Sequence, residues 1–507
     1  MRWIPEKYAD AGRRAARSAG RLLGLACLVP TLTQAASLAL PGDMGFRHDL
    51  QFLSDSGLTG VPLSTWPISL PDVSKALMPV DAETIADPGV RSTLIRAQER
   101  LRREMRLGLT APEVSFGLNS DPTLLRGFEA TPREEAELGY SVDYLGQRLA
   151  GHLSATVVSS AEDDKTFRLD DSYLSWALGN WSLTAGVQSR WWGPGWDGSL
   201  IWSNNARPIP GITFERNYST PFQTPWLSWL GPWKFTSFIG QLEEDRAVSD
   251  ARFLGLRFDF RPTDKLEIGI SRTAQWGGDG RPEDFDTFLK LLAGIDNRGN
   301  DLAVADEPGN QLGGFDFRWR SPLFGNWPYA IYGQAIGEDE AGGLPSRYIG
   351  LFGIEIWGSS ARLDGTWRVF AEAADTATGG FYGDALYNYA YEHAIYQSGY
   401  RYYGHSIGHT LDSDGRLFTL GFLLNRNNGR LWSMVARVGE LNRDGGNARA
   451  SARSLFSGNS TDYWGLELGN AFELFGGWVV WGVSYEAVDG VGAGDDVSVH
   501  ARWSYVF

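Results

Sequence analysis

The first regular pattern along the chain has the period of an amphipathic helix. Its longest stretch begins at Asp87, which can cap a helix that has proline at its first position, and ends at Gly108. The apolar positions recur there at spacings of three and four: Val90, Leu94, Ala97, Leu101 and Met105. Two shorter helices are predicted over Arg47–Leu53 and Val73–Leu77. Because each helix has one apolar stripe that must be covered, we expect a packed helical plug over residues 36–110.

From about residue 112 the period changes to two, the period of a strand with one buried face. In one such strand a single face is predicted to carry Phe167, Leu169, Asp171, Tyr173, Ser175 and Ala177. Asn428-Gly429 lies between the strands predicted over Leu417–Leu424 and Leu431–Val438, which is a strong hairpin signal. We count about sixteen to eighteen such strands. Long loops are predicted near 191–232, 276–310 and 376–415.

The last strand is the most specific sign of the architecture. Its alternating residues share one face and end at the final residue of the sequence: Val497, Val499, Ala501, Trp503, Tyr505 and Phe507. A soluble β-sandwich can end in this way by chance. Short turns on one side, long loops on the other and a closed strand count favour an outer-membrane barrel over 111–507, because a closed barrel leaves no unpaired backbone in lipid. We therefore expect the outer-membrane barrel assembly machinery as a partner during biogenesis.

The N-terminus has the form of an export signal. A basic stretch precedes the apolar run Leu22–Leu32, which is too short to span a bilayer, and Thr33-Gln34-Ala35 offers small residues for cleavage before Ala36. We assign residues 1–35 to a signal peptide; the alternative is an anchored amphipathic N-terminus. Cys27, the single cysteine, lies in the apolar run, so the mature chain would contain no disulfide.

Charge and composition narrow the partners. The full chain has a formal net charge of −15, and removal of residues 1–35 takes away six basic and two acidic residues and leaves −19. A nucleic-acid partner is disfavoured, because phosphate binding requires the opposite sign. The chain has 21 Trp and 19 Tyr, residues that suit both membrane boundaries and sugar-binding surfaces. No cofactor is indicated.

The densest group of candidate functional residues lies between positions 190 and 207. Indole faces can stack on the C–H faces of sugars, while carboxylates, amides and guanidinium groups bond hydroxyls. Arg190 and Arg207 could also pair with acidic groups of a glycan. The alternative is that these rings lie in the interfacial girdle or pack a loop inside the lumen. The candidates for polysaccharide binding are Arg190, Trp191, Trp192, Trp196, Asp197, Asn204, Asn205 and Arg207.

A second aromatic stretch, residues 387–415, adds Tyr400 and Arg401 to these candidates. His405 and His409 lie in the same stretch, but a glycine-broken loop does not present both on one face, so we expect no metal site. A polar, aromatic loop in the mouth or lumen is the favoured interpretation. The acidic run Glu338-Asp339-Glu340 is either a divalent cation site or, more often, a solvated turn. Since no nucleophile motif, zinc spacing or phosphate loop is present, we predict that the chain is not an enzyme.

The run Arg190-Trp-Trp-Gly-Pro-Gly-Trp-Asp-Gly-Ser-Leu-Ile, followed by Ser203-Asn-Asn-Ala-Arg-Pro-Ile-Pro-Gly-Ile, resembles the signature of the Wzi family of capsule-assembly outer-membrane proteins. Gly314-Phe-Asp-Phe-Arg318 and Ile395-Tyr-Gln-Ser-Gly-Tyr-Arg-Tyr-Tyr-Gly404 are also similar to family segments, and the resemblance extends over about 43–507. Trp202 departs from the smaller or aliphatic residue that the family pattern leads us to expect.

The resemblance implies a barrel of about eighteen strands with a helical bundle that closes its periplasmic side. It also implies a surface lectin of a Gram-negative cell, which binds exported capsular polysaccharide or exopolysaccharide and attaches it to the cell. The expected partners are an acidic surface polysaccharide and the lipid and lipopolysaccharide of the outer membrane, and the expected state is a monomer. The alternatives are a channel or transport protein for polysaccharide or small solutes, and an outer-membrane enzyme.

Overall fold

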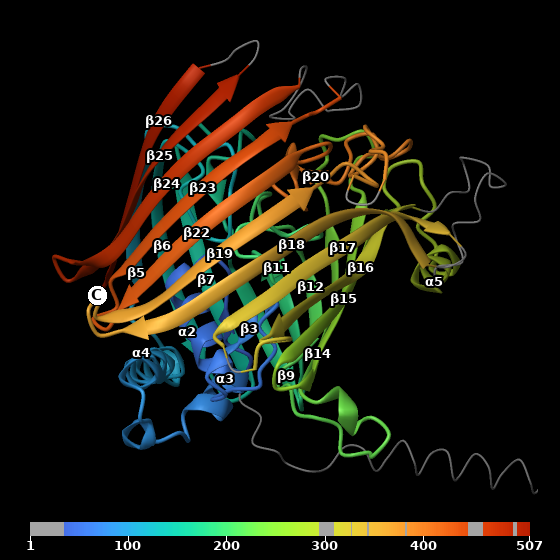
Figure 1. The fold of residues 1–507 in the computed structure, drawn as a ribbon. Coiled ribbons are helices and arrows are strands. Elements are labelled where there is room, and N and C mark those ends of the chain that lie inside the picture. The colour runs from blue at the N-terminus through green and yellow to red at the C-terminus, as the bar shows by residue number, and fades with distance from the viewer. Residues whose placement is uncertain are drawn as a thin grey trace, which may run out of the picture.

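The computed structural model describes residues 35–293, 309–325, 327–341, 344–380, 383–444, 460–489 and 494–507. They form an antiparallel barrel of 18 strands with helices at one end (Figure 1). Strand β26 closes the ring on β5, in a register that runs from Val506 opposite Glu113 to His500 opposite Asn119. The wall strands are β5 (Glu113–Asn119), β6 (Ala136–Leu145), β7 (Leu149–Val158), β9 (Tyr173–Leu178), β10 (Trp181–Val187), β12 (Pro210–Arg216), β13 (Trp233–Gln241), β14 (Arg252–Thr263), β15 (Leu266–Trp276), β16 (Gly309–Arg320), β17 (Tyr329–Ala341), β18 (Leu344–Ser360), β19 (Gly365–Asp375), β22 (Arg416–Arg426), β23 (Leu431–Leu441), β24 (Thr461–Leu474), β25 (Gly477–Asp489) and β26 (Gly494–Val506).

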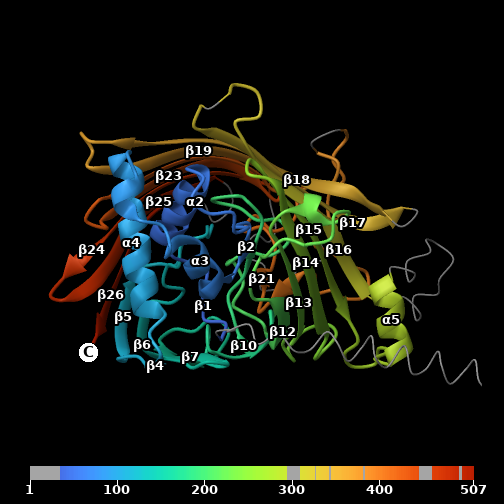
Figure 2. The same cartoon turned by 90° about the horizontal axis from the view of Figure 1, so that it is seen from below.

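The three predicted helices are present and lie at the end of the barrel where the short turns are. Helices α2 (Met44–Asp55) and α3 (Leu70–Leu77) lie within the ring of strands, and α4 (Pro88–Glu104) runs along its rim (Figure 2). The Asp87 carboxylate caps α4 by accepting the backbone N–H groups of Gly89 and Val90 at 2.8 and 3.0 Å, as the sequence predicts. None of the helices in the described ranges is long and apolar enough to cross a membrane.

Short elements complete the fold. Strand β1 (Leu38–Ala39) pairs with β3 (Ile68–Ser69), β2 (Thr65–Trp66) pairs with β11 (Trp191–Trp192), and β20 (Arg401–Tyr402) pairs with β21 (His405–Ser406). These three pairs are separate from the barrel sheet. The remaining elements are the strand pieces β4 (Gly108–Leu109) and β8 (Phe167–Arg168), helix α5 (Phe285–Ala293) and the 3-10 turns η2 (Ala82–Thr84) and η3 (Ser228–Leu230).

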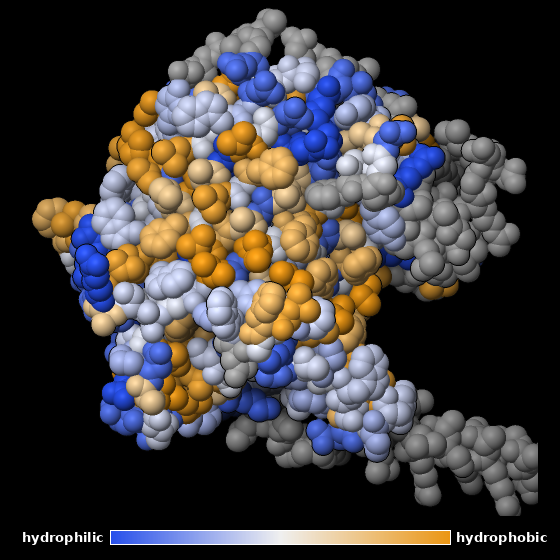
Figure 3. All heavy atoms as spheres, viewed as in Figure 1, coloured by the Kyte–Doolittle hydropathy of each residue, from blue (hydrophilic) through white to orange (hydrophobic). Residues whose placement is uncertain are grey.

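The outer surface of the wall is apolar, as a lipid-facing surface must be. Apolar side chains gather across the middle of the barrel, and hydrophilic ones gather at the long-loop end (Figure 3). In β26, Val497 and Val499 are exposed while Ser498 and His500 between them are buried. Over these four residues the alternation agrees with the shared face predicted for the last strand, whereas Ala501 and Arg502 are both exposed.

The shared face predicted for residues 167–177 is wrong. Phe167 and Leu169 are exposed, whereas Tyr173 is buried. The reason is a turn between β8 and β9, in which Asp171 has a left-handed backbone with φ 70°. This turn restarts the alternation, so the two halves of the segment point to opposite faces.

The prediction of one long loop over 191–232 is also wrong, in the middle of that range. Strand β12 crosses the wall there and pairs with β10 and β13. Residues 188–209 therefore belong to the long-loop end, and residues 217–232 lie at the helix end (Figure 1). The predicted loop 276–310 contains α5 and lies partly outside the described residues, and 376–415 contains the β20–β21 hairpin. The predicted signal peptide lies outside the described residues except for Ala35.

Candidate functional site: a lumen filled by two loops and the plug

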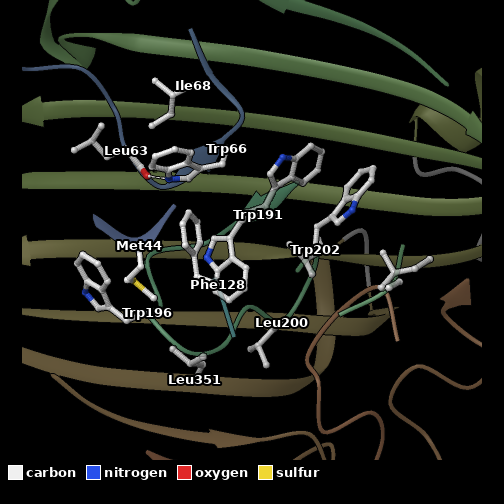
Figure 4. Close-up of a cluster of buried hydrophobic side chains, with 14 of the residues drawn as sticks. Met44, Leu63, Trp66, Ile68, Phe128, Trp191, Trp196, Leu200, Trp202 and Leu351 are labelled. Carbon is white, nitrogen blue, oxygen red and sulfur yellow. Dashed lines mark hydrogen bonds between the residues drawn. The ribbon is translucent and has the colours of Figure 1, made fainter. Parts of the chain in front are cut away.

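The tryptophan motif folds into the barrel and forms the centre of its core. Trp191 pairs through its backbone with Trp66 of the plug, and both indoles contact the edge of the Phe128 ring, with centroid distances of 5.3 and 5.2 Å. Trp202 lies 4.9 Å from Trp192, ring centroid to ring centroid. These aromatic side chains come together from the plug and from two loops (Figure 4). All five of them are buried, so the motif joins plug and loop in one apolar cluster.

Helix α2 holds the motif from the plug side. The Arg47 guanidinium donates to the backbone carbonyl oxygens of Gly195 and Pro194 at 2.7 and 3.2 Å. It also lies over the rings of Phe128 and Trp196, at 4.2 and 4.4 Å from their centroids. Burial lowers the pKa of Arg47 to about 9, which still leaves it charged at neutral pH.

Strands of the barrel wall hold the motif from the other side. The Glu372 carboxylate of β19 accepts the backbone N–H groups of Trp196, Asp197 and Gly198, the last at 3.1 Å. It also accepts the Tyr332 hydroxyl at 2.8 Å. Three successive backbone donors around one carboxylate form an anion-binding corner, so we call residues 196–198 with Glu372 the Glu372 latch.

Asp197 adds an ion pair to this latch. Its carboxylate accepts Nη2 and Nε of Arg437 at 2.7 and 3.0 Å and the Thr419 hydroxyl at 2.8 Å. Burial by itself raises the pKa of Asp197, but Arg437 and Thr419 bring it below its ordinary value. Glu355, on β18, accepts the Trp196 indole N–H at 2.8 Å. Asp197 is thus an anchor to the wall.

The second aromatic loop closes over the first. Hydroxyls of Tyr391 and Tyr400 donate to the backbone carbonyl oxygens of Leu200 and Ile201 at 2.6 and 2.8 Å. The Ser203 N–H donates to the carbonyl of Ile407 at 2.9 Å. Within this loop, Arg401 donates to Asp412 at 2.6 and 2.8 Å and to Glu392 at 2.5 Å. The two loops therefore interlock across the lumen.

The remaining candidates are also occupied. Arg190 donates to the Thr213 hydroxyl at 2.6 Å, and burial lowers the pKa of Arg190 to about 10. The side-chain amides of Asn204 and Asn205 donate to backbone carbonyls of Phe128 and Ser406 at 2.8 and 3.0 Å. Arg207 binds Asp170 through two bonds of 2.9 and 2.7 Å and also binds Asp163. Its charge is therefore matched by carboxylates of this chain.

Nine of the ten predicted sugar contacts are buried, and the tenth, Arg207, is partly buried. A pocket beside Trp196 has a volume of about 20 Å³, room for about one water molecule. The structure thus brings the predicted residues together in a packed core. This agrees with the alternative interpretation of the tryptophan cluster, in which the rings pack a loop inside the lumen. Their direct contact with polysaccharide stays a prediction.

The wall residues that hold Trp196 and Asp197 were not predicted as functional. Glu355, Glu372 and Arg437 are charged residues on the inward faces of β18, β19 and β23. The sequence does carry a signal for them. A charge at an inward position of an alternating strand requires a partner inside the barrel, and the tryptophan loop supplies it.

The histidines and the acidic run form no common site. His405 contacts the exposed Glu162 at 3.2 Å, whereas His409 is buried beside Gly198. Glu338 accepts the backbone N–H of Tyr391, and the side chains of Asp339 and Glu340 lie outside those described. Across the described ranges, no group of three or more His, Cys, Asp or Glu side chains could hold a metal ion.

Comparison with known proteins identifies the family. The family model "Capsule assembly protein Wzi" matches residues 112–496. The chain belongs to this family. It is an outer-membrane β-barrel family of capsule assembly, not an enzyme family, which agrees with the prediction that the chain is not an enzyme. The resemblance predicted from the tryptophan motif is thereby confirmed.

Two relatives of the Wzi family are informative. An uncharacterized 55.8 kDa protein in the cps region of Klebsiella pneumoniae is 35% identical over 362 residues, which cover 70% of this chain and 68% of that protein. The solved structure of Wzi from Escherichia coli, described as an outer-membrane protein involved in group 1 capsule assembly and a carbohydrate-binding β-barrel, is 29% identical. It superposes with a TM-score of 0.80 and covers 93% of this chain and 100% of its own. The predicted barrel with N-terminal helices is confirmed.

Proposed function

We propose that this protein binds exported capsular polysaccharide, or a related exopolysaccharide, at the outer surface and attaches it to the cell. Membership of the Wzi family and the carbohydrate binding described for the Escherichia coli relative support this proposal. The observation that carries it is the interlocking of the two aromatic loops over the plug, for example through Tyr391 and Leu200. A lumen filled in this way favours a holder of polysaccharide over the alternative channel.

We place the first sugar contacts on the outward side of these loops. Tyr403 and Gly404 form the tip of the β20–β21 hairpin, with positive φ values of 48° and 83°. The half-buried Tyr403 ring lies 5.6 Å from the Arg207 guanidinium, which packs against the ring. Tyr389 lies 4.5 Å from the guanidinium of the exposed Arg347. Such ring faces can stack on sugars.

The wider setting follows from the same proposal. We infer cleavage after residue 35, a plug over 36–110 and a barrel over 111–507 that is surrounded by outer-membrane lipid and lipopolysaccharide. A closed ring leaves no free strand edge for association, which supports a monomer. The outward apolar face of β26 supports recognition by the barrel assembly machinery.

The test compares cell-bound with released polysaccharide in a deletion strain that is complemented with variants. Deletion should shift polymer into the medium, and the Tyr389→Ala/Tyr403→Ala variant should do the same although it inserts normally. Tyr144→Ala, a change of an exposed tyrosine at the opposite end of the barrel, is the matched control. Unchanged cell-bound polymer in the deletion strain would contradict the function. A large, steady conductance of the purified protein in planar bilayers would favour the channel.

A further inference from the structure

Near its C-terminal end, helix α4 carries arginines that take no part in its ion pairs. Arg96 pairs with Asp49, and Arg100 pairs with Asp43 and Glu104, so these residues are matched within the plug. Three further arginines on the exposed side are not matched in this way: Arg102, Arg103 and Arg106. Within the part of the chain that the structure describes, none of the three forms an ion pair. The cluster is basic on a chain whose formal net charge is −15.

This cluster lies directly below the lipid-facing wall. Helix α4 leads into β4, which pairs with Tyr144 and Leu145 of β6 on the barrel. Leu107 and Leu109, which follow the arginines, are 65% and 73% exposed, and Leu109 lies opposite the exposed Tyr144 of the wall. Arg148, in the β6–β7 turn next to this pairing, is exposed as well. Figure 2 shows α4 running along the rim toward β4 and β6.

We propose that these four residues, the inner-rim arginine patch (Arg102, Arg103, Arg106 and Arg148), bind the phosphate headgroups of anionic phospholipids. In outer-membrane barrels the short turns face the periplasm, so this rim lies at the inner leaflet. Since Leu107 and Leu109 face the acyl chains, the adjacent guanidinium groups lie at headgroup depth, where long side chains reach the interface. Guanidinium groups match phosphate oxygens through paired hydrogen bonds.

The consequence of such binding is a tether for the plug. Helix α4 contacts the barrel at its start, where Ser92 donates to Asn427 at 2.6 Å and the Asp87 carboxylate accepts the Ser359 hydroxyl at 3.3 Å. Lipid bound at the other end would fix α4 to the rim along its full length. The patch is thus a lipid site on the periplasmic side, distinct from the glycan-facing loops.

The experiment measures which phospholipid stays with the full-length protein. The purified barrel is placed in nanodiscs of mixed phosphatidylethanolamine and phosphatidylglycerol, released into detergent and analysed by native mass spectrometry. Wild type should retain phosphatidylglycerol preferentially, and less of it at high salt. In the Arg102→Gln/Arg103→Gln/Arg106→Gln variant, the preference for phosphatidylglycerol should fall about fivefold for each arginine removed. All three positions are exposed, so folding should be unaffected.

Two controls make the outcome decisive. The triple lysine variant keeps the charges and should retain most of the preference, whereas Lys165→Gln, at an exposed position of the long-loop end, should behave as wild type. An unchanged preference in the glutamine variant would overturn the proposal. Equal retention of both phospholipids by wild type would also overturn it. The same holds if the glutamine variant keeps its lipid preference and loses only a cross-link to a periplasmic protein in cells. Inorganic phosphate at the same concentration as the lipid should not displace the bound phosphatidylglycerol. Displacement would assign the patch to free phosphate and overturn the proposal.

Discussion

The Glu372 latch predicts that one buried carboxylate keeps the lumen closed. Glu372→Gln preserves the shape of the side chain but leaves one oxygen to accept the backbone N–H groups of Trp196, Asp197 and Gly198 and the Tyr332 hydroxyl. One or two hydrogen bonds to a charged acceptor are lost, each worth about 1.5–3 kcal/mol. The new amide N–H also faces a backbone donor. We therefore expect docking of the loop to weaken by about 3–5 kcal/mol.

A change of this size should be visible as exposure of the tryptophan loop. At about 1.4 kcal/mol per factor of ten, the undocked population should rise by roughly two to three and a half orders of magnitude. Chymotrypsin added to cells or proteoliposomes should then cut after Trp191 or Trp196 at a rate that follows this population, because cleavage requires the open form. Planar bilayers should show brief openings that wild type lacks.

The matched control is Glu473→Gln, which neutralises an exposed carboxylate of β24. This variant should be cut no faster than wild type. Both variants must first show the heat-dependent gel mobility of a folded barrel, so that misfolding is not mistaken for release of the loop. Equal cleavage rates for Glu372→Gln and wild type would refute the reasoning, since the carboxylate would then contribute nothing to docking.

The other predictions concern the same packed lumen. In Gly198→Ala the new methyl group would lie 2.3 Å from Nε2 of His409, so the loop should shift and be cut faster, at a cost of about 1–3 kcal/mol; wild-type cleavage would contradict this. Burial lowers the pKa of His409 to about 4 from 6.5, so the contribution of His409 to docking should be full above pH 6.5 and should fall by up to about 3 kcal/mol as pH falls to 4. Cleavage measured across this range should show the loss, and His409→Asn should reduce the pH dependence that His405→Asn leaves in place. Trp191→Ala should insert normally, but the cavity it leaves should cost about 3–5 kcal/mol of stability and lower the unfolding temperature. An unchanged unfolding temperature in a gel-shift melt would contradict this.

Local patterns in the sequence were sufficient for many elements of this fold, but not for β12 or α5. Asp87 followed by proline marks where α4 begins, and the alternation from Val497 to His500 marks the outward face of that part of β26. Both depend on neighbours that are close in the chain. The alternation failed at Asp171 because one left-handed residue reverses the faces, and nothing in the apolar pattern marks it.

The role of the tryptophan motif could be predicted only in part. Its composition suits sugar stacking and loop packing equally, since an indole buries the same ring in both cases. The choice depends on partners far along the chain: Trp66 lies 125 positions before Trp191, and Glu372 lies 176 positions after Trp196. Short-range periodicity carries no information about such contacts. The inward charges of the wall were the signal that a loop would be held inside.

In this arrangement different residues hold the loops in place and contact the polysaccharide. Substitutions at Trp191 and at Tyr403 would both release polysaccharide if the proposed function holds, but for different reasons. Trp191 is buried and acts by holding the loops in place, so its loss must also speed proteolysis of the loop. Tyr403 lies at a hairpin tip, so its loss should release polysaccharide without faster cleavage. If Tyr403→Ala also opened the loop, the hairpin would be part of the lock, and the sugar-binding surface would have to lie elsewhere on the long-loop end.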